Sequence, residues 1–172
     1  MLFKQSRPPL YFVGGNFGEG VVCARNARTG NWSPPAFFTV AGGSFGFQVG
    51  VESIDLVLLV MNKKGLDSIL QSKVVLGGDI SATAGPVGRT LEAGTDILLK
   101  SEIYSYSRTK GLFAGISLKG ATIFANDDAN RAFYGKELSA RQITLEHDAK
   151  NIPQAAEKLV QILNHITKRD SK

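Results

Sequence analysis

The sequence predicts an α+β domain with a mainly antiparallel β-sandwich or barrel-like core, short helices and a C-terminal amphipathic helix. Apolar residues alternate at period two up to Phe124, and helical spacing begins after Asn126. Glycine is abundant, with 19 residues against six prolines, which is typical of turns and bulges. A chain of 172 residues can bury one core. We expect an N-terminal arm (1–10), a domain (11–150) and a helix packed on it or extending from it (151–172).

The first strand is expected near Tyr11, because Pro8-Pro9 interrupts the polar N-terminus. Val21–Arg25 and Trp32–Val40 predict a hairpin, with Asn26–Asn31 as its turn.

The middle of the chain predicts two strands and a helix. Phe45–Val51 places its apolar residues on one face and glycines on the other. Ile54–Met61 is apolar on both faces after Asp55, which predicts a central strand covered on both sides. Asn62 then caps a short helix. The inward face of this helix carries Leu66, Ile69 and Leu70.

From Val74 to Phe124 the alternation continues, which predicts a run of antiparallel strands joined by short turns. The expected strand segments are Val74–Ala84, Thr90–Leu99, Glu102–Arg108 and Leu112–Phe124.

The remainder of the chain is helical in pattern. Asp127 or Asp128 caps a short helix ending near Tyr134, with Gly135 after its end. Ser139-Ala-Arg-Gln142 is a capping-box pattern. A helix beginning near Pro153 carries an apolar stripe. The stripe consists of Ile152, Ala156, Leu159, Leu163 and Ile166.

Residues capable of catalysis do not form a recognisable constellation. His147 and His165 lack a second ligand at metal-binding spacing. Cys23 lies in an apolar strand, where a small buried residue is the better interpretation. Three acids on neighbouring strands could bind a cation or act as an acid–base pair, but the solvent face of a sheet explains them better. They are Asp79, Glu92 and Asp96. We therefore expect no enzyme activity, no cofactor and no metal.

One strand suggests a binding surface. Tyr104, Tyr106 and Arg108 share a face, and Lys110 begins the following turn. Aromatic rings interleaved with cations hold nucleic acid or lipid headgroups, whereas an aromatic ladder with a charged turn would explain the same residues. The net charge of +5 favours anionic partners without selecting one.

Four segments resemble, in order, the SYLF domain family. They are GGSFGFQVGVESIDLVLLVMN, LGGDISATAGPVGRTLEAG, YSYSRTKGLFAGISLKGA and DDANRAFYG. The resemblance covers about Gly14 to Thr144, and such domains occur in bacterial secreted or lipid-anchored proteins, yeast actin-patch proteins, an animal phosphoinositide-binding adaptor and plant FYVE-containing proteins. The tail KELSARQI, with no appended adaptor domain, predicts a bacterial member that is membrane-associated and periplasmic or secreted.

The resemblance implies binding without catalysis. The expected function is binding of anionic phospholipid or phosphoinositide. The alternative is a protein-interaction module, either actin-binding or a cell-envelope scaffold. The expected partner is therefore an anionic membrane lipid, with a protein partner as the second possibility and no nucleic acid.

The expected lipid site lies near the N-terminus and the first hairpin turn. In eukaryotic relatives a basic amphipathic helix makes the lipid contact, and here Pro8-Pro9 would break such a helix. The residues expected to contact lipid are Leu2, Phe3, Lys4, Arg7, Arg25 and Arg28. The alternative binding strip is Tyr104, Tyr106, Arg108 and Lys110.

Overall fold

A computed structural model describes residues 2–5, 16–42, 55–87, 101–109 and 112–168 of the chain. The chain divides into two compact units. The first consists of Met1–Gly20 and Phe38–Phe124, and the second of Val21–Phe37 and Ala125–Lys172. The first contains most of the strands and the second most of the helices, so the α+β class is confirmed.

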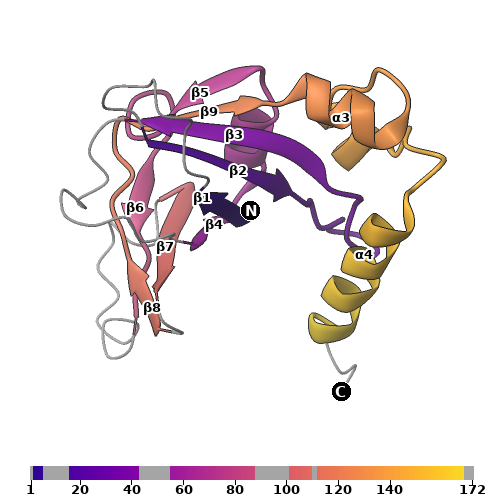
Figure 1. Ribbon diagram of the computed structural model, residues 1–172. Helices are drawn as coiled ribbons and strands as arrows, with labels where there is room; N and C mark the ends of the chain where they lie inside the picture. The colour runs from indigo at the N-terminus through magenta and orange to yellow at the C-terminus, as the bar shows by residue number, and fades with distance from the viewer. Residues whose placement is uncertain (1, 6–15, 43–54, 88–100, 110–111, 169–172) are drawn as a thin grey trace. The chain divides into compact units, whose positions relative to one another are not determined.

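The described strands form one nine-stranded sheet in the order β5-β9-β3-β2-β1-β4-β7-β6, and β8 also pairs with β7 (Figure 1). Their bounds are β1 Leu2–Gln5, β2 Asn16–Val22, β3 Ala36–Gly42, β4 Asp55–Val60, β5 Lys73–Val75, β6 Ala82–Ala84, β7 Ile103–Thr109, β8 Leu112–Gly115 and β9 Thr122–Ala125. The predicted strands Phe45–Val51 and Thr90–Leu99 lie outside the described residues.

The first strand begins earlier than expected. β1 pairs antiparallel with β4, with Leu2 opposite Val57 and Lys4 opposite Asp55. The expectation of a first strand near Tyr11 was therefore wrong. The four residues of β1 are too few to show the period-two alternation of a strand. They form a strand by pairing with β4, more than fifty residues later in the chain.

The predicted first hairpin turn is present. Arg25 and Trp32 form an antiparallel bridge, and the amide of Asn26 donates to the carbonyl of Asn31 over 2.8 Å. The side chain of Asn26 accepts from the amides of Arg28 and Thr29, an arrangement typical of asparagine in turns.

β4 is central, between β1 and β7, but it is covered on one face only. Leu56 and Leu58 are buried, whereas Leu59 is 46% exposed and Met61, just after the strand, 53%. The prediction of a strand covered on both sides was wrong. The apolar run of β4 is equally consistent with a strand that buries one face and exposes apolar side chains to solvent on the other.

The predicted antiparallel run from Val74 to Phe124 was wrong in three respects. The predicted strand Val74–Ala84 is two strands, β5 and β6, and the predicted strand Leu112–Phe124 is also two, β8 and β9. β5 pairs with β9 at one end of the sheet, whereas β6 lies at the other end. β6 runs parallel to β7, with Ala82 opposite Ile103 and Ala84 opposite Ser105. Alternation gives the period of a strand but neither its neighbour nor its direction.

The helix α1 (Lys63–Ile69) follows β4 as predicted. The side chain of Asn62 caps it by accepting from the amide of Gly65 over 2.8 Å. Ile69 and Leu70 are buried in the core of the first unit. The largest fully buried side chains of this unit are Phe38, Leu58, Ile69, Leu76, Ile103, Leu118 and Ile123.

The helix α3 (Asp127–Tyr134) lies in the second unit. Asn126, rather than Asp127 or Asp128, caps it, and Gly135 ends it in the left-handed region at φ 65°. The hydroxyl of Tyr134 donates to the carbonyl of Pro35 over 2.6 Å.

The predicted capping box is formed. The amide of Gln142 donates to the hydroxyl of Ser139, and the amide of Ser139 donates to the side chain of Gln142. The short π-helix η2 (Gln142–Glu146) follows.

The helix α4 (Gln154–Ile166) begins directly after Pro153, as predicted. Of its apolar stripe, Ala156 is buried, but Ile166 is largely exposed at the end of the helix. Among the described residues, no helix combines the length and apolar character needed to cross a membrane.

Candidate binding surface

One face of the sheet gathers aromatic and aliphatic side chains from three strands. Leu59 of β4 lies opposite Tyr104 of β7, and Phe113 of β8 lies opposite Arg108 of β7. Directly opposed residues of an antiparallel pair share a face. We call this set the aromatic face. It consists of Val57, Leu59, Tyr104, Tyr106, Arg108 and Phe113.

The aromatic face is partly open to solvent. Phe113 is 55% exposed, Leu59 is nearly as exposed, and both tyrosines are half-buried. Leu112 is 77% exposed but pairs with Thr109, so it lies on the other face of the β7–β8 pair. Exposed apolar side chains that share one face of a sheet, as Leu59 and Phe113 do, are typical of an interaction surface.

Arg108 supplies the positive charge of this face. Its guanidinium lies 5.9 Å from the ring centroid of Phe113, within the range of a cation–π contact. Asp55 lies opposite Arg108 on β4. The side chain of Arg108 is itself exposed, so it can contact a partner while it orders Phe113.

The ring of Tyr106 packs against Gly85. A Cβ atom added at Gly85 would collide with the ring of Tyr106, so only glycine fits there. The hydroxyl of Tyr106 donates to the carbonyl of Pro86 over 3.4 Å, and burial raises the pKa of Tyr106, with the neighbouring Tyr104 adding to the effect. Three residues of the predicted binding strip, Tyr104, Tyr106 and Arg108, therefore share one face of β7. The fourth, Lys110, lies outside the described residues.

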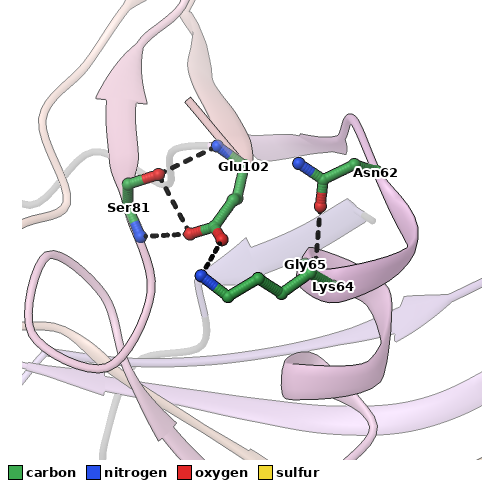
Figure 2. A network of polar contacts seen from close by, with 5 residues as sticks. All are labelled: Asn62, Lys64, Gly65, Ser81 and Glu102. Atoms are coloured by element: carbon green, nitrogen blue, oxygen red, sulfur yellow. Dashed lines mark hydrogen bonds and ion pairs between the residues drawn. The ribbon is translucent and has the colours of Figure 1, made fainter. Parts of the chain in front are cut away.

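A buried carboxylate fastens the start of β7, the middle strand of this face, to its neighbours (Figure 2). The Oε2 atom of Glu102 accepts hydrogen bonds from the amide and hydroxyl of Ser81, over 2.9 and 3.0 Å. Its Oε1 atom lies 2.7 Å from Nζ of Lys64 in α1. The amide of Glu102 donates to the hydroxyl of Ser81 in return. We call these three residues the Glu102 clamp.

The Glu102 clamp joins three elements. Ser81 precedes β6, Glu102 precedes β7 and Lys64 lies in α1, so the clamp ties the parallel β6–β7 pair to the helix. The side chain of Glu102 is only 11% exposed, and the hydrogen bond from Lys64, followed by those from Ser81, holds the pKa of its carboxyl below the ordinary value. Every oxygen of this carboxylate has a partner, so its role is to position strands.

The residues predicted for lipid binding lie in two places. Leu2, Phe3 and Lys4 belong to β1 in the first unit, whereas Arg7 lies outside the described residues. Arg25 and Arg28 belong to the turn of the second unit. The guanidinium of Arg25 donates to the carbonyls of Gly30 and Thr167, and Arg28 is exposed.

Of the three acids considered for catalysis, only Asp79 lies within the described residues. Asp79 accepts from the amide of Val75 within its own turn, and Glu92 and Asp96 lie outside the described residues. Within the described ranges, no three His, Cys, Asp or Glu side chains are grouped as a metal site would require. Burial raises the pKa of Cys23 to about 11, which disfavours its thiolate.

Sequence reasoning missed Leu59, Phe113 and the Glu102 clamp. Leu59 and Phe113 stand in apolar runs that predict burial, and only the strand register shows which face they occupy. The sequence does not predict the contact of Glu102 with Ser81, because the two residues are 21 positions apart and belong to no recognisable motif.

An α+β domain with an exposed aromatic face, whose strand β7 is tied to β6 and α1 through the buried carboxylate of Glu102, has the features of a binding domain. Comparison with known proteins gives the family. The family described as "Ysc84: Las17-binding protein actin regulator" matches residues 41–166. The chain belongs to this family, the SYLF family that its four segments resemble.

Several curated relatives are similar over most of the chain. It is 37% identical to Protein YSC84 of Saccharomyces cerevisiae, over 89% of this chain and 33% of that protein. It is 34% identical to the SH3 domain-containing YSC84-like protein 1 of Mus musculus, over 92% of this chain and 46% of the relative. It is 36% identical to LAS seventeen-binding protein 3 of Saccharomyces cerevisiae, over 77% of this chain and 29% of that protein. The chain thus spans between about a third and a half of these relatives. No solved structure matches it.

Proposed function

We propose that this domain is a non-enzymatic protein-binding module that contacts actin or an actin-regulating protein through its aromatic face. The observation that carries the proposal is the exposure of Leu59 and Phe113 beside Tyr104, Tyr106 and Arg108. The family description and the names of its relatives refer to Las17 binding and actin regulation, which supports a protein partner of this kind.

The composition of the aromatic face suits a protein interface. Tyrosine and arginine are enriched among the residues that contribute most to protein binding, and large aliphatic side chains surround them. The ring of Tyr106 packs directly on Gly85, and the guanidinium of Arg108 lies over the ring of Phe113. A face ordered in advance loses less entropy when a partner binds.

Co-sedimentation with actin filaments tests the proposal. We expect wild-type protein to pellet with filaments, and Leu59→Ser with Phe113→Ser to reduce the bound fraction at least tenfold. Ile162→Ser is a matched control, because Ile162 is an exposed aliphatic residue of similar accessibility in the second unit. Equal pelleting of the double variant and wild type would show that another surface binds. Wild-type protein left in the supernatant would exclude actin itself as the partner.

A second candidate function is binding to anionic membrane lipid, with the protein associated with a membrane surface. The β7–β8 hairpin presents Leu112 and Phe113 to solvent next to Arg108. Exposed apolar side chains beside a cation can enter the lipid interface while the cation contacts headgroups, and each cation contributes about 1 kcal/mol. The predicted residues Leu2, Phe3, Lys4, Arg7, Arg25 and Arg28 remain part of this proposal.

Liposome sedimentation separates the two functions. Lipid binding predicts weak retention on anionic vesicles and hardly any on neutral ones, and the retention should fall steeply as salt rises. Arg108→Glu should weaken retention if the hairpin makes the contact, and Lys4→Glu with Arg7→Glu should weaken it if the N-terminal residues do. Equal sedimentation on neutral and anionic vesicles would contradict both lipid sites.

A further inference from the structure

The second unit contains a groove that neither the aromatic face nor the Glu102 clamp involves. Its volume is about 480 Å³, within the usual range of binding pockets. Trp32 and Pro34, before β3, line one part of it, and Ile152 and Val160, before and within α4, line another. All four side chains are apolar or aromatic, so the groove offers a surface for apolar groups.

Hydrogen bonds fix the tryptophan of this groove. The indole Nε1–H of Trp32 donates to the hydroxyl of Thr167 over 2.8 Å, and the amide of Trp32 donates to the side chain of Asn164 over 2.9 Å. Arg25 joins the same helix end by donating to the carbonyl of Thr167. The ring is therefore held at its polar edge, and a ligand would meet an ordered aromatic wall.

Among the described residues that line the groove there is one carboxylate, that of Glu157, and no lysine or arginine. Within the described part of the chain, no lysine or arginine forms a salt bridge with Glu157. The groove thus presents one carboxylate with no described salt-bridge partner, in a chain whose net charge is +5. A carboxylate and a tryptophan lining one groove favour a cation, since the cation gains both Coulomb and cation–π attraction.

We propose that this groove binds an extended segment of a partner protein that presents an arginine or lysine between apolar residues. The cationic side chain pairs with Glu157 and lies against Trp32, while its apolar neighbours contact Ile152 and Val160. An acidic segment is disfavoured by Glu157. This interaction is independent of the aromatic face, so either can fail without the other.

Tryptophan fluorescence tests this proposal directly, because Trp32 is the single tryptophan of the chain. The full chain is titrated with acetyl-Pro-Leu-Arg-Leu-Pro-amide, and separately with the same peptide carrying citrulline or glutamate in place of arginine. Citrulline keeps the shape of arginine without its charge. We expect a saturable fluorescence change with the arginine peptide, and at least tenfold weaker binding of the other two.

Reversing the charge of Glu157 tests the proposal a second way. Glu157→Lys should abolish the response to the arginine peptide, whereas Glu137→Lys, a largely exposed acid of the same unit outside the groove, should leave it unchanged. Circular dichroism melting confirms that both variants are folded; if Glu157→Lys is not, Glu157→Gln replaces it and should weaken binding at least threefold. An equal response to all three peptides, a response that survives the Glu157 change, or no response to any peptide would overturn the proposal. Fluorescence that changes on dilution without peptide would indicate a second copy as the occupant instead.

Discussion

The two units hold their exposed apolar side chains in place by different means. In the first unit, Leu59 and Phe113 share a face because β4 and β8 pair with β7 in a particular register. In the second unit, Ile162 and Ile166 stand on one helix, where spacing along the chain is enough to make them neighbours. A sheet surface therefore depends on long-range pairing, and a helix surface depends mainly on local sequence.

This difference predicts that substitutions in the sheet cost more than substitutions in the helices. The largest expected effect is at Leu58, which is 1% exposed on the inner face of β4. Leu58→Asp buries an unpaired carboxylate and should abolish cooperative folding of the first unit, a loss of several kcal/mol. Leu59→Asp, one residue along on the outer face, should cost at most about 1 kcal/mol. Urea unfolding of both variants checks this pair, and a Leu58→Asp protein as stable as Leu59→Asp would refute the assignment of faces.

A smaller effect than at Leu58, similar to that expected at Glu102, is expected where Gly85, just after β6, meets Tyr106 of β7. Gly85→Ala places a Cβ atom against the ring of Tyr106 and should destabilise the first unit by about 1–3 kcal/mol. Gly78→Ala is the matched control, because its added Cβ atom makes only ordinary contacts and should change stability by less than about 0.5 kcal/mol. Thermal unfolding distinguishes them, and equal melting temperatures would mean that Tyr106 is not packed on Gly85.

The Glu102 clamp should make the stability of the sheet depend on pH. Its folded-state pKa is lowered from the ordinary value of 4.5, so its contribution is present above that value and is lost as pH falls through the folded pKa. Glu102→Gln should cost about 1.5–3 kcal/mol at pH 7, as expected for a hydrogen bond to a charged group. The difference from wild type should shrink in acid.

Urea unfolding at pH 7 and at several lower pH values measures this change. Glu137→Gln, at a largely exposed acid, is the control and should show little effect at any pH. A difference between wild type and Glu102→Gln that stays constant down to the acid limit of folding would contradict a charged clamp.

The smallest effect is expected at a helix cap of the second unit. Ser139→Ala removes the hydroxyl that accepts from the amide of Gln142 and should cost about 1 kcal/mol. Ser139→Asp keeps an acceptor at this position and should restore most of the loss. Amide hydrogen exchange over residues 140–146 measures the effect locally, and unchanged exchange in Ser139→Ala would show that the cap does not stabilise this segment.

The sequence by itself determined the features that depend on neighbours a few residues away. Asn62 caps α1, Ser139 and Gln142 form the capping box, and α4 begins after Pro153, each as the local pattern predicts. These features rest on hydrogen bonds between a side chain and backbone three residues apart, or on the helical period itself. The family resemblance was likewise available in the order of four segments and is confirmed.

Only the tertiary structure decided which apolar residues are buried and that the carboxylate of Glu102 bonds to Ser81 and Lys64. Leu58 and Leu59 are chemically identical neighbours in one apolar run, and the packing of the sheet buries the first and exposes the second. Ser81 and Glu102 meet because β6 runs parallel to β7, a pairing that alternation cannot specify. The physical reason is that register and strand direction arise from contacts between distant segments, whose free energies depend on the assembled sheet and not on any local stretch of sequence.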